Sequence, residues 1–440
     1  MQKENKILSF AKNILLPLVL AVISFVVIFA SFYNNFSKNV PDGFENWQYD
    51  SEMLVLVKML NAKDDGILSH AALLPLPYYD IRGDLSKESF YNIYKYDLPI
   101  KPNYTVYLKQ VGLQGIGASV IDKYLPFNNS QTLKLLYAIN CGLLCLMVGF
   151  IAFWVYKKVN LVAGLVMFLS CYFNVWLCYG ARNLYWVFWT YLLPMCGVVA
   201  VVWLEEKTGK THNIILAVVT FLTVLLKCAC GFEFMSCILV AAELPLLYMA
   251  ITNKWKISTY IKRSCIVGAS GLAGFAGAFG INFLQQVVFL NSFSSAVTSM
   301  KYGIAKRTGL FASQFKTFSD MLVPQAIEDS LNVPLKNVMT GYFNSTQLFS
   351  YKGEFLPINI KQVFFALVGV FALAMVLSLF LKCFKQNRRK LIGLFTITAV
   401  SFSLLKNPEG GTGVISVNVS EIVFRYCCSA FTSSPFEPTF

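Results

Sequence analysis

The stretch LYAINCGLLCLMVGFIAFWVY (136–156) is predominantly apolar and is followed directly by Lys157 and Lys158. As an α-helix, a run of this length covers about 30 Å, which is the thickness of the hydrocarbon core of a bilayer. Lysines at the end of such a run are typical of the border between hydrocarbon and water. The stretch therefore predicts a transmembrane helix.

The composition extends this prediction to the whole chain. Of its 440 residues, 56% are hydrophobic and 14% are charged, whereas soluble domains contain about 25% charged residues. The predicted fold class is an all-α polytopic membrane protein with about nine transmembrane helices. The first apolar run is too long for a signal peptide and lacks a small-residue cleavage site, so we expect a retained anchor helix. The predicted spans are 14–33, 136–156, 160–180, 185–204, 213–227, 234–251, 264–290, 362–381 and 391–405.

Charged residues are distributed unevenly between the two sides of these spans. One side contains most lysines and arginines of the short connections, and the short turns of the other side contain Arg182 and Lys227. The positive-inside rule then predicts a cytoplasmic N-terminus, and we expect an integral protein of a bacterial plasma membrane. This asymmetry explains most of the net charge of +14, so we expect no nucleic-acid partner.

The predicted topology divides the chain into consecutive segments. Long loops face the extracytoplasmic side, and the end of the chain has no span-length apolar run and no role that we can assign. The segments are a cytoplasmic N-terminus (1–13), a first transmembrane helix (14–33), an extracytoplasmic loop (34–135), a six-helix transmembrane region (136–290), a second extracytoplasmic loop (291–361), two C-terminal transmembrane helices (362–405) and a tail (406–440).

The first extracytoplasmic loop contains two stretches that predict short helices. Residues 53–60 are apolar on most sides but too few to span a bilayer, and residues 108–125 form a second, glycine-dotted apolar segment. We expect both to lie at the membrane interface rather than in an independent domain. Between them, the prolines of LLPLPYYD (73–80) are expected to break regular structure.

An acidic motif, YDSE (49–52), opens the first of these helical stretches. Asp50 and Glu52 have two interpretations at this position. They could cap the helix and interact favourably with its dipole. Alternatively, a carboxylate at the outer membrane surface could act as the general base for a lipid-linked substrate. Their spacing does not suggest a two-carboxylate glycosidase pair.

The turn in YGARNLYWVFW (179–189) carries a cation and several aromatic residues. The planar guanidinium of Arg182 suits a pair of phosphate oxygens, but an interfacial arginine can equally extend to lipid headgroups. Tyr185 and Trp186 fit an interfacial aromatic belt and a surface for contact with a sugar or lipid.

Further cations could join Arg182 at an anionic headgroup. Lys227 lies in the next outer turn, where it could also pair with Glu233, and Lys306 and Arg307 follow the seventh span. Charges so close to hydrocarbon tend to be functional or paired. We therefore treat Lys227, Lys306 and Arg307 as candidate donor-phosphate ligands.

Other kinds of site are disfavoured by the sequence. The chain has only 2 histidines, so a His-based triad or multi-histidine metal centre is not expected. Most cysteines lie inside apolar runs, where they behave as small hydrophobic residues. The glycines of GASGLAGFAGAFG (268–280) are spaced for close helix packing rather than for a phosphate-binding loop.

The order of these parts over residues 10–400 resembles the GT-C superfamily of integral-membrane glycosyltransferases, which includes protein O-mannosyltransferases and bacterial aminoarabinose transferases. The matching features are one anchor span, a long first outer loop with the motif QYDSE (48–52), and paired spans with short connections. The resemblance implies that Asp50, and next Glu52, is the catalytic acid/base. It also implies that the sugar arrives on a polyprenyl phosphate or diphosphate.

The expected function is therefore transfer of a sugar from a polyprenyl-phosphate-linked donor to a glycan, lipid or protein acceptor of the cell envelope, on the extracytoplasmic face and with inversion. A nucleotide-sugar fold is not needed, and no cofactor is implied; a divalent cation is compatible with the sequence. The alternatives are a transporter or flippase for lipid-linked glycans and a non-catalytic membrane subunit. A transporter would show repeated halves and charges near the bilayer midplane, where Glu243 is the clear candidate.

Overall fold

The computed structural model describes residues 16–38, 40, 44–77, 87–100, 102–308, 350–351, 354–380 and 388–396. The predicted tail (406–440), most of the second extracytoplasmic loop (291–361) and most of the ninth predicted span (391–405) lie outside the described residues.

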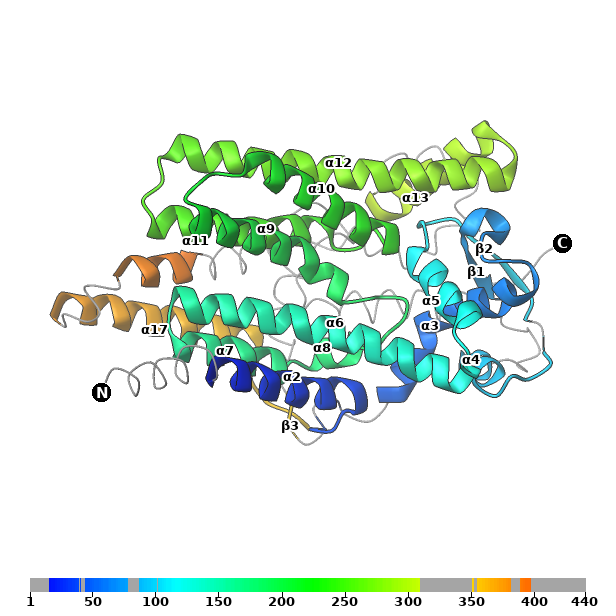
Figure 1. The fold of residues 1–440 in the computed structure, drawn as a ribbon, viewed down its shortest axis with the longest axis horizontal. Coiled ribbons are helices and arrows are strands. Elements are labelled where there is room, and N and C mark those ends of the chain that lie inside the picture. The colour runs from blue at the N-terminus through cyan, green and yellow to red at the C-terminus, as the bar shows by residue number, and fades with distance from the viewer. Residues whose placement is uncertain are drawn as a thin grey trace, which may run out of the picture.

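A bundle of long apolar helices forms most of the described chain (Figure 1). Within the described residues, 6 helices are long and apolar enough to cross a membrane. This finding confirms an all-α membrane protein, but it does not confirm the predicted count of about nine spans. The six helices are α6 (Asn129–Lys158), α9 (Trp189–Thr208), α10 (Asn213–Cys230), α11 (Met235–Thr252), α12 (Ile257–Leu290) and α17 (Ile360–Phe380).

Two of the predicted spans have other forms in the structure. The first corresponds to α2 (Leu16–Asn34), which packs beside α6. The third, predicted over 160–180, is divided into α7 (Leu161–Tyr172) and α8 (Val175–Gly180), so a single helix there is wrong. The reason is Asn174, whose side chain accepts a hydrogen bond from the backbone N–H of Leu177 (2.9 Å) and starts a new helix.

The glycine-rich segment of α12 packs closely against α10, as predicted. A Cβ atom on Gly274 would lie 2.6 Å from the carbonyl oxygen of Phe221 and 3.0 Å from the backbone nitrogen of Leu225. Only a residue without a side chain permits this approach of the two backbones. The α10–α12 contact is thus set by backbone proximity.

One end of the bundle carries a small group of elements from the first predicted loop, which we call the α3–α5 module (Figure 1). We call this end of the bundle the module end. The elements are α3 (Phe44–Asp64), the 3₁₀ helix η2 (Ser69–Ala72), β1 (Leu74–Pro77), α4 (Lys87–Lys95), β2 (Tyr104–Tyr107) and α5 (Leu113–Tyr124).

The helix α3 is the core of this module. Val55, Leu56 and Val57 are fully buried, and they pack in one cluster with residues of α4, α5 and β1. A helix that is apolar on all sides needs this kind of surrounding. The predicted helices in this loop are confirmed by α3 and α5, while their position at the membrane interface stays a prediction.

Two details of the module differ from the predictions. Because α3 begins at Phe44, Asp50 and Glu52 lie beyond its first turn, and a helix-capping role for them is wrong. The prolines in 73–80 do not prevent regular structure either. β1 pairs antiparallel with β2, Leu74 opposite Tyr107, in a two-stranded sheet whose edges tolerate proline.

Residues near the C-terminal end of α12 hold the α3–α5 module against the bundle. The amide nitrogen of Gln285 donates to the carbonyl oxygens of Ala71 (3.0 Å) and Val111 (3.1 Å), and that of Gln286 donates to the carbonyl oxygen of Leu108 (2.8 Å). The remaining described elements are α13 (Phe293–Thr308), which follows α12, and the paired strands β3 (Ser350–Tyr351) and β4 (Glu354–Phe355).

Candidate functional site

The acidic motif meets the bundle through Glu52. This side chain is fully buried. Its Oε2 accepts a hydrogen bond from the hydroxyl of Tyr137 on α6 (2.7 Å), and its Oε1 accepts one from the backbone N–H of Leu184 (2.9 Å). Two donors on a buried carboxylate offset much of the cost of its burial. Glu52 thus joins α3 to α6 and to the turn after α8.

Arg182 contacts the ring of the same tyrosine. Its guanidinium carbon is 4.9 Å from the centre of the Tyr137 ring and 4.3 Å from that of Phe44, and its Nη1 donates to the carbonyl oxygen of Tyr33 (3.1 Å). The residue is only 6% exposed. Cation–π contacts with two rings, together with a hydrogen bond to a carbonyl oxygen, fix the orientation of the guanidinium.

The turn that carries Arg182 is shaped by Asn183. Its Oδ1 accepts hydrogen bonds from the backbone N–H groups of Tyr185 (3.0 Å) and Trp186 (2.9 Å), and its Nδ2 donates to Ser51 Oγ (3.2 Å). Asparagine commonly forms such bonds to the backbone that follows it. Ser51, which precedes Glu52 on α3, is therefore hydrogen-bonded to Asn183, which follows Arg182.

Three residues that connect α3, α6 and the turn after α8 were not predicted from the sequence: Tyr137, Asn140 and Asn183. Asn140 donates to the carbonyl oxygen of Asn183 (3.4 Å) and accepts from the indole N–H of Trp189 (3.1 Å). A sequence signal was present, because an asparagine inside an apolar span usually has a specific partner. Tyr137 gave no such signal, since tyrosine is common near the ends of spans.

The predicted aromatic contact residues have different environments. Tyr185 is 8% exposed and belongs to the core of the α3–α5 module, and its carbonyl oxygen accepts from the side chain of Gln114 (3.2 Å). Trp186 is half-buried, with its ring centre 6.4 Å from that of Phe234. Of the two residues, Trp186 is the more exposed.

Lys227 lies at the end of α10 and is 1% exposed. Its Nζ donates to the carbonyl oxygen of Gly231 (2.5 Å) and lies 4.4 Å from the centre of the Tyr191 ring. The ring of Tyr191 also contacts Phe234, which in turn contacts Trp186. A row of aromatic rings therefore leads from Lys227 to the turn that carries Arg182.

A buried glutamine lies near Lys227. Gln110 is 1% exposed, and in the part of the chain that the structure describes neither polar atom of its amide has a hydrogen-bond partner. A Cβ atom on Gly231 would lie 3.3 Å from Gln110 Oε1 and would overlap Glu233 Oε2. The absence of a side chain at Gly231 lets these two polar groups approach the backbone. The module end thus contains carboxylate, amide and ammonium groups at its contact with the α3–α5 module.

Three candidate residues have side chains outside the described residues. The backbone of Asp50 is part of α3, and the backbones of Lys306 and Arg307 are part of α13. Their predicted roles stay predictions. Within the described residues, no group of three or more His, Cys, Asp or Glu side chains could hold a metal ion.

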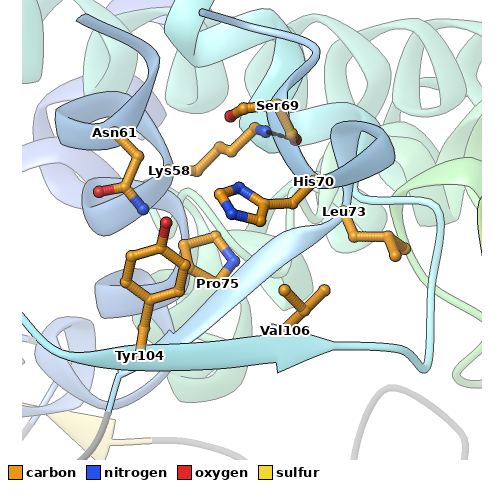
Figure 2. A pocket seen from close by; sticks show the side chains of 8 residues that line it. All are labelled: Lys58, Asn61, Ser69, His70, Leu73, Pro75, Tyr104 and Val106. Carbon is orange, nitrogen blue, oxygen red and sulfur yellow. Dashed lines mark hydrogen bonds between the residues drawn. The ribbon is translucent and has the colours of Figure 1, made fainter. Parts of the chain in front are cut away.

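A second polar locus of the module surrounds Lys58 (Figure 2). This lysine is 1% exposed, and its Nζ donates to the carbonyl oxygen of Ser69 (3.0 Å). Burial lowers its pKa from 10.5 to about 8, against a smaller opposite effect of Asp65. The pocket at this site has no room for a water molecule. It is lined by Lys58, Asn61, Ser69, His70, Leu73, Pro75, Tyr104 and Val106.

The backbone at this locus is in an unusual conformation. His70, Ala71 and Ala72 have φ angles of 55°, 54° and 63°, a left-handed conformation that is costly for residues other than glycine. The bond from Gln285 to the carbonyl oxygen of Ala71 helps to hold this segment. The ring of His70 lies edge-on to that of Tyr104, with ring centres 5.6 Å apart.

No protein-family model, curated protein or solved structure matches the chain.

Proposed function

We propose that the chain is a membrane glycosyltransferase of the GT-C type, which moves a sugar from a polyprenyl-phosphate-linked donor to a cell-envelope acceptor on the extracytoplasmic face. One observation carries the proposal: the acidic motif of α3 and the turn of Arg182, 130 residues apart (182 − 52), meet at Tyr137. A transferase of this kind needs a carboxylate and fixed positive charge at one place.

In the proposed reaction, the acceptor hydroxyl attacks the anomeric carbon of the sugar as the bond to the lipid phosphate breaks. The configuration at that carbon inverts. Asp50 takes the proton of the hydroxyl, and the bonding electrons leave with the phosphate. Both oxygens of Glu52 already accept hydrogen bonds, so in this proposal Glu52 positions the start of α3 rather than acting as the base.

The positive charges of Arg182 and Lys227 stabilise the departing phosphate in this proposal, together with Lys306 and Arg307. Arg182 and Lys227 are 6% and 1% exposed, so direct contact with the donor requires the α3–α5 module to shift from the bundle. Trp186, which is half-buried, lies on the same turn as Arg182 and is the proposed contact for the sugar or the lipid.

The test uses Asp50→Asn and Arg182→Lys in cells that produce no other copy of the protein. We expect Asp50→Asn to lower surface-glycan formation by at least about 100-fold, the usual contribution of a general base. We expect Arg182→Lys to lower surface-glycan formation by about 10- to 100-fold, because lysine lacks the planar guanidinium group. Glu88→Gln, which alters an exposed acid on α4, is the matched control.

Membrane levels and thermal unfolding of each variant separate loss of chemistry from loss of folding. A transferase variant leaves the lipid-linked donor on the outer leaflet, where a membrane-impermeant reagent reaches it. A donor retained on the cytoplasmic side would instead indicate a flippase, and normal glycan in both variants would contradict the proposal.

A further inference from the structure

The end of the bundle opposite the α3–α5 module, which we call the basic end, contains a groove between α6 and α9. Its accessible volume is about 130 Å³. A single water molecule needs only about 10–15 Å³ on this measure, so the groove has room for part of a larger molecule. The lining residues are Phe153, Trp154, Lys157, Lys158 and Trp203.

A polar atom in this lining has no hydrogen-bond partner among the described residues. Trp154 is 6% exposed, and the atom is its buried indole Nε1. A buried indole N–H normally donates to an acceptor, because leaving it unpaired costs free energy. The rest of the ring is fixed edge-on against Tyr248 of α11, with ring centres 5.6 Å apart. An oxygen atom of a ligand in the groove is a suitable acceptor.

Two lysines, one in the groove lining and one over the lining residue Trp203, have no carboxylate partner among the described residues. Lys157 Nζ lies 5.5 Å from the centre of the Phe153 ring, and Lys207 Nζ lies 4.6 Å from that of Trp203. By contrast, the nearby Lys158 is paired with Glu206. Two ammonium groups that rest on the rings of the lining leave net positive charge at the mouth of the groove.

An exposed apolar surface lies on the same face of α6 as the groove. Leu146 lies seven residues before Phe153 on α6, which places both on the same face of the helix. Leu146 is 57% exposed in an apolar membrane-spanning helix, so its surface faces lipid. A molecule in the groove therefore meets positive charge at one end and an apolar surface along the helix.

We propose that this groove binds an anionic phospholipid. The phosphate lies between Lys157 and Lys207, an oxygen of the headgroup region accepts from Trp154 Nε1, and an acyl chain follows the apolar face of α6. The aromatic lining and the exposed leucine favour a lipid over a free phosphate ion, which would gain nothing from apolar contact. Basic pockets between transmembrane helices are suited to such headgroups.

The test measures lipid bound to the purified full chain by native mass spectrometry in a mild detergent. Phosphatidylglycerol and phosphatidylcholine with identical acyl chains are titrated separately, so that only the headgroup charge differs. We expect the wild type to prefer phosphatidylglycerol. Lys157→Gln and Lys207→Gln should each lower that preference about fivefold, and both together by more, because each lysine near a headgroup phosphate is worth about that factor.

Lys262→Gln is the matched control, since Lys262 is an exposed lysine on α12 at the basic end and lines no part of the groove. Trp154→Phe retains an aromatic ring but removes the N–H, and it should weaken binding of both lipids a few-fold. Equal binding of the two lipids by the wild type would overturn the proposal. So would an equal loss of preference in Lys262→Gln and Lys157→Gln, or failure of excess phosphatidylglycerol to outcompete glycerol phosphate.

Discussion

Two buried sites at opposite ends of the bundle hold their charges in different ways. At the basic end, Arg263 Nη2 lies 2.7 Å from Glu205 Oε2, and the two side chains are 4% and 10% exposed. At the module end, Glu52 is held by a tyrosine hydroxyl and a backbone N–H, and Lys58 is held by a backbone carbonyl. The first arrangement joins opposite charges, and the second surrounds a charge with dipoles.

The two arrangements differ in the electric field that the charge presents to a ligand. A cation paired with a carboxylate has little net field left for a ligand, whereas a cation held by carbonyls and rings retains it. No ion pair joins Lys58 to any other residue that the structure describes. The arrangement at Glu52 and Lys58 is thus the costlier one for the folded state, and sites for charged ligands commonly have this cost.

Removing the buried carboxylate should have the largest effect on stability. In Glu52→Ala, the hydroxyl of Tyr137 and the backbone N–H of Leu184 lose their acceptor inside the protein. We expect the free energy of unfolding to fall by about 3–5 kcal/mol. Thermal unfolding of the purified protein measures this, with Glu88→Ala as the exposed control. Glu52→Gln, which keeps one acceptor oxygen, should lose less; equal losses would show that the hydrogen bonds contribute little.

Breaking the ion pair at the basic end should have a somewhat smaller effect. Arg263→Met leaves the nearly buried Glu205 without its partner, which we expect to cost about 3 kcal/mol, as for other buried pairs. Replacing both residues, in Arg263→Met with Glu205→Leu, should restore most of the loss because two charges no longer require burial. The same unfolding measurement applies. A double variant as unstable as the single one would indicate that the pair contributes through packing instead.

The effect expected at Lys58 depends on pH and is the smallest of the three for a change of one pH unit. Its pKa is lowered from 10.5 to about 8 by burial, so between these values the unfolded chain binds more protons than the folded one. The stability of the wild type should therefore rise with pH from about 8 to 10.5, by up to about 1.4 kcal/mol per pH unit, relative to Lys58→Met. Below pH 8 the full penalty of the buried charge applies. The difference between the two unfolding curves isolates Lys58, and a difference independent of pH would contradict the assignment.

The candidate site could be predicted from the sequence only in part. The charges of Glu52 and Arg182 stood out because acidic and basic residues are rare beside apolar spans. Their meeting at Tyr137 could not be predicted, since that residue lies 85 positions after Glu52 within an apolar run (137 − 52). The burial of Glu52 was equally unpredictable, because it depends on how α3 packs against the bundle.

The sequence by itself determined the membrane-spanning helices and the helical form of α3 and α5. Long apolar runs without charge have few alternatives in a bilayer, where each backbone polar group must be bonded within its own segment. The tertiary structure decided where the third run divides, how the proline-containing β1 pairs with β2, and which charges become buried. These features depend on contacts between residues far apart in the chain, whose free energies no local pattern of residues records.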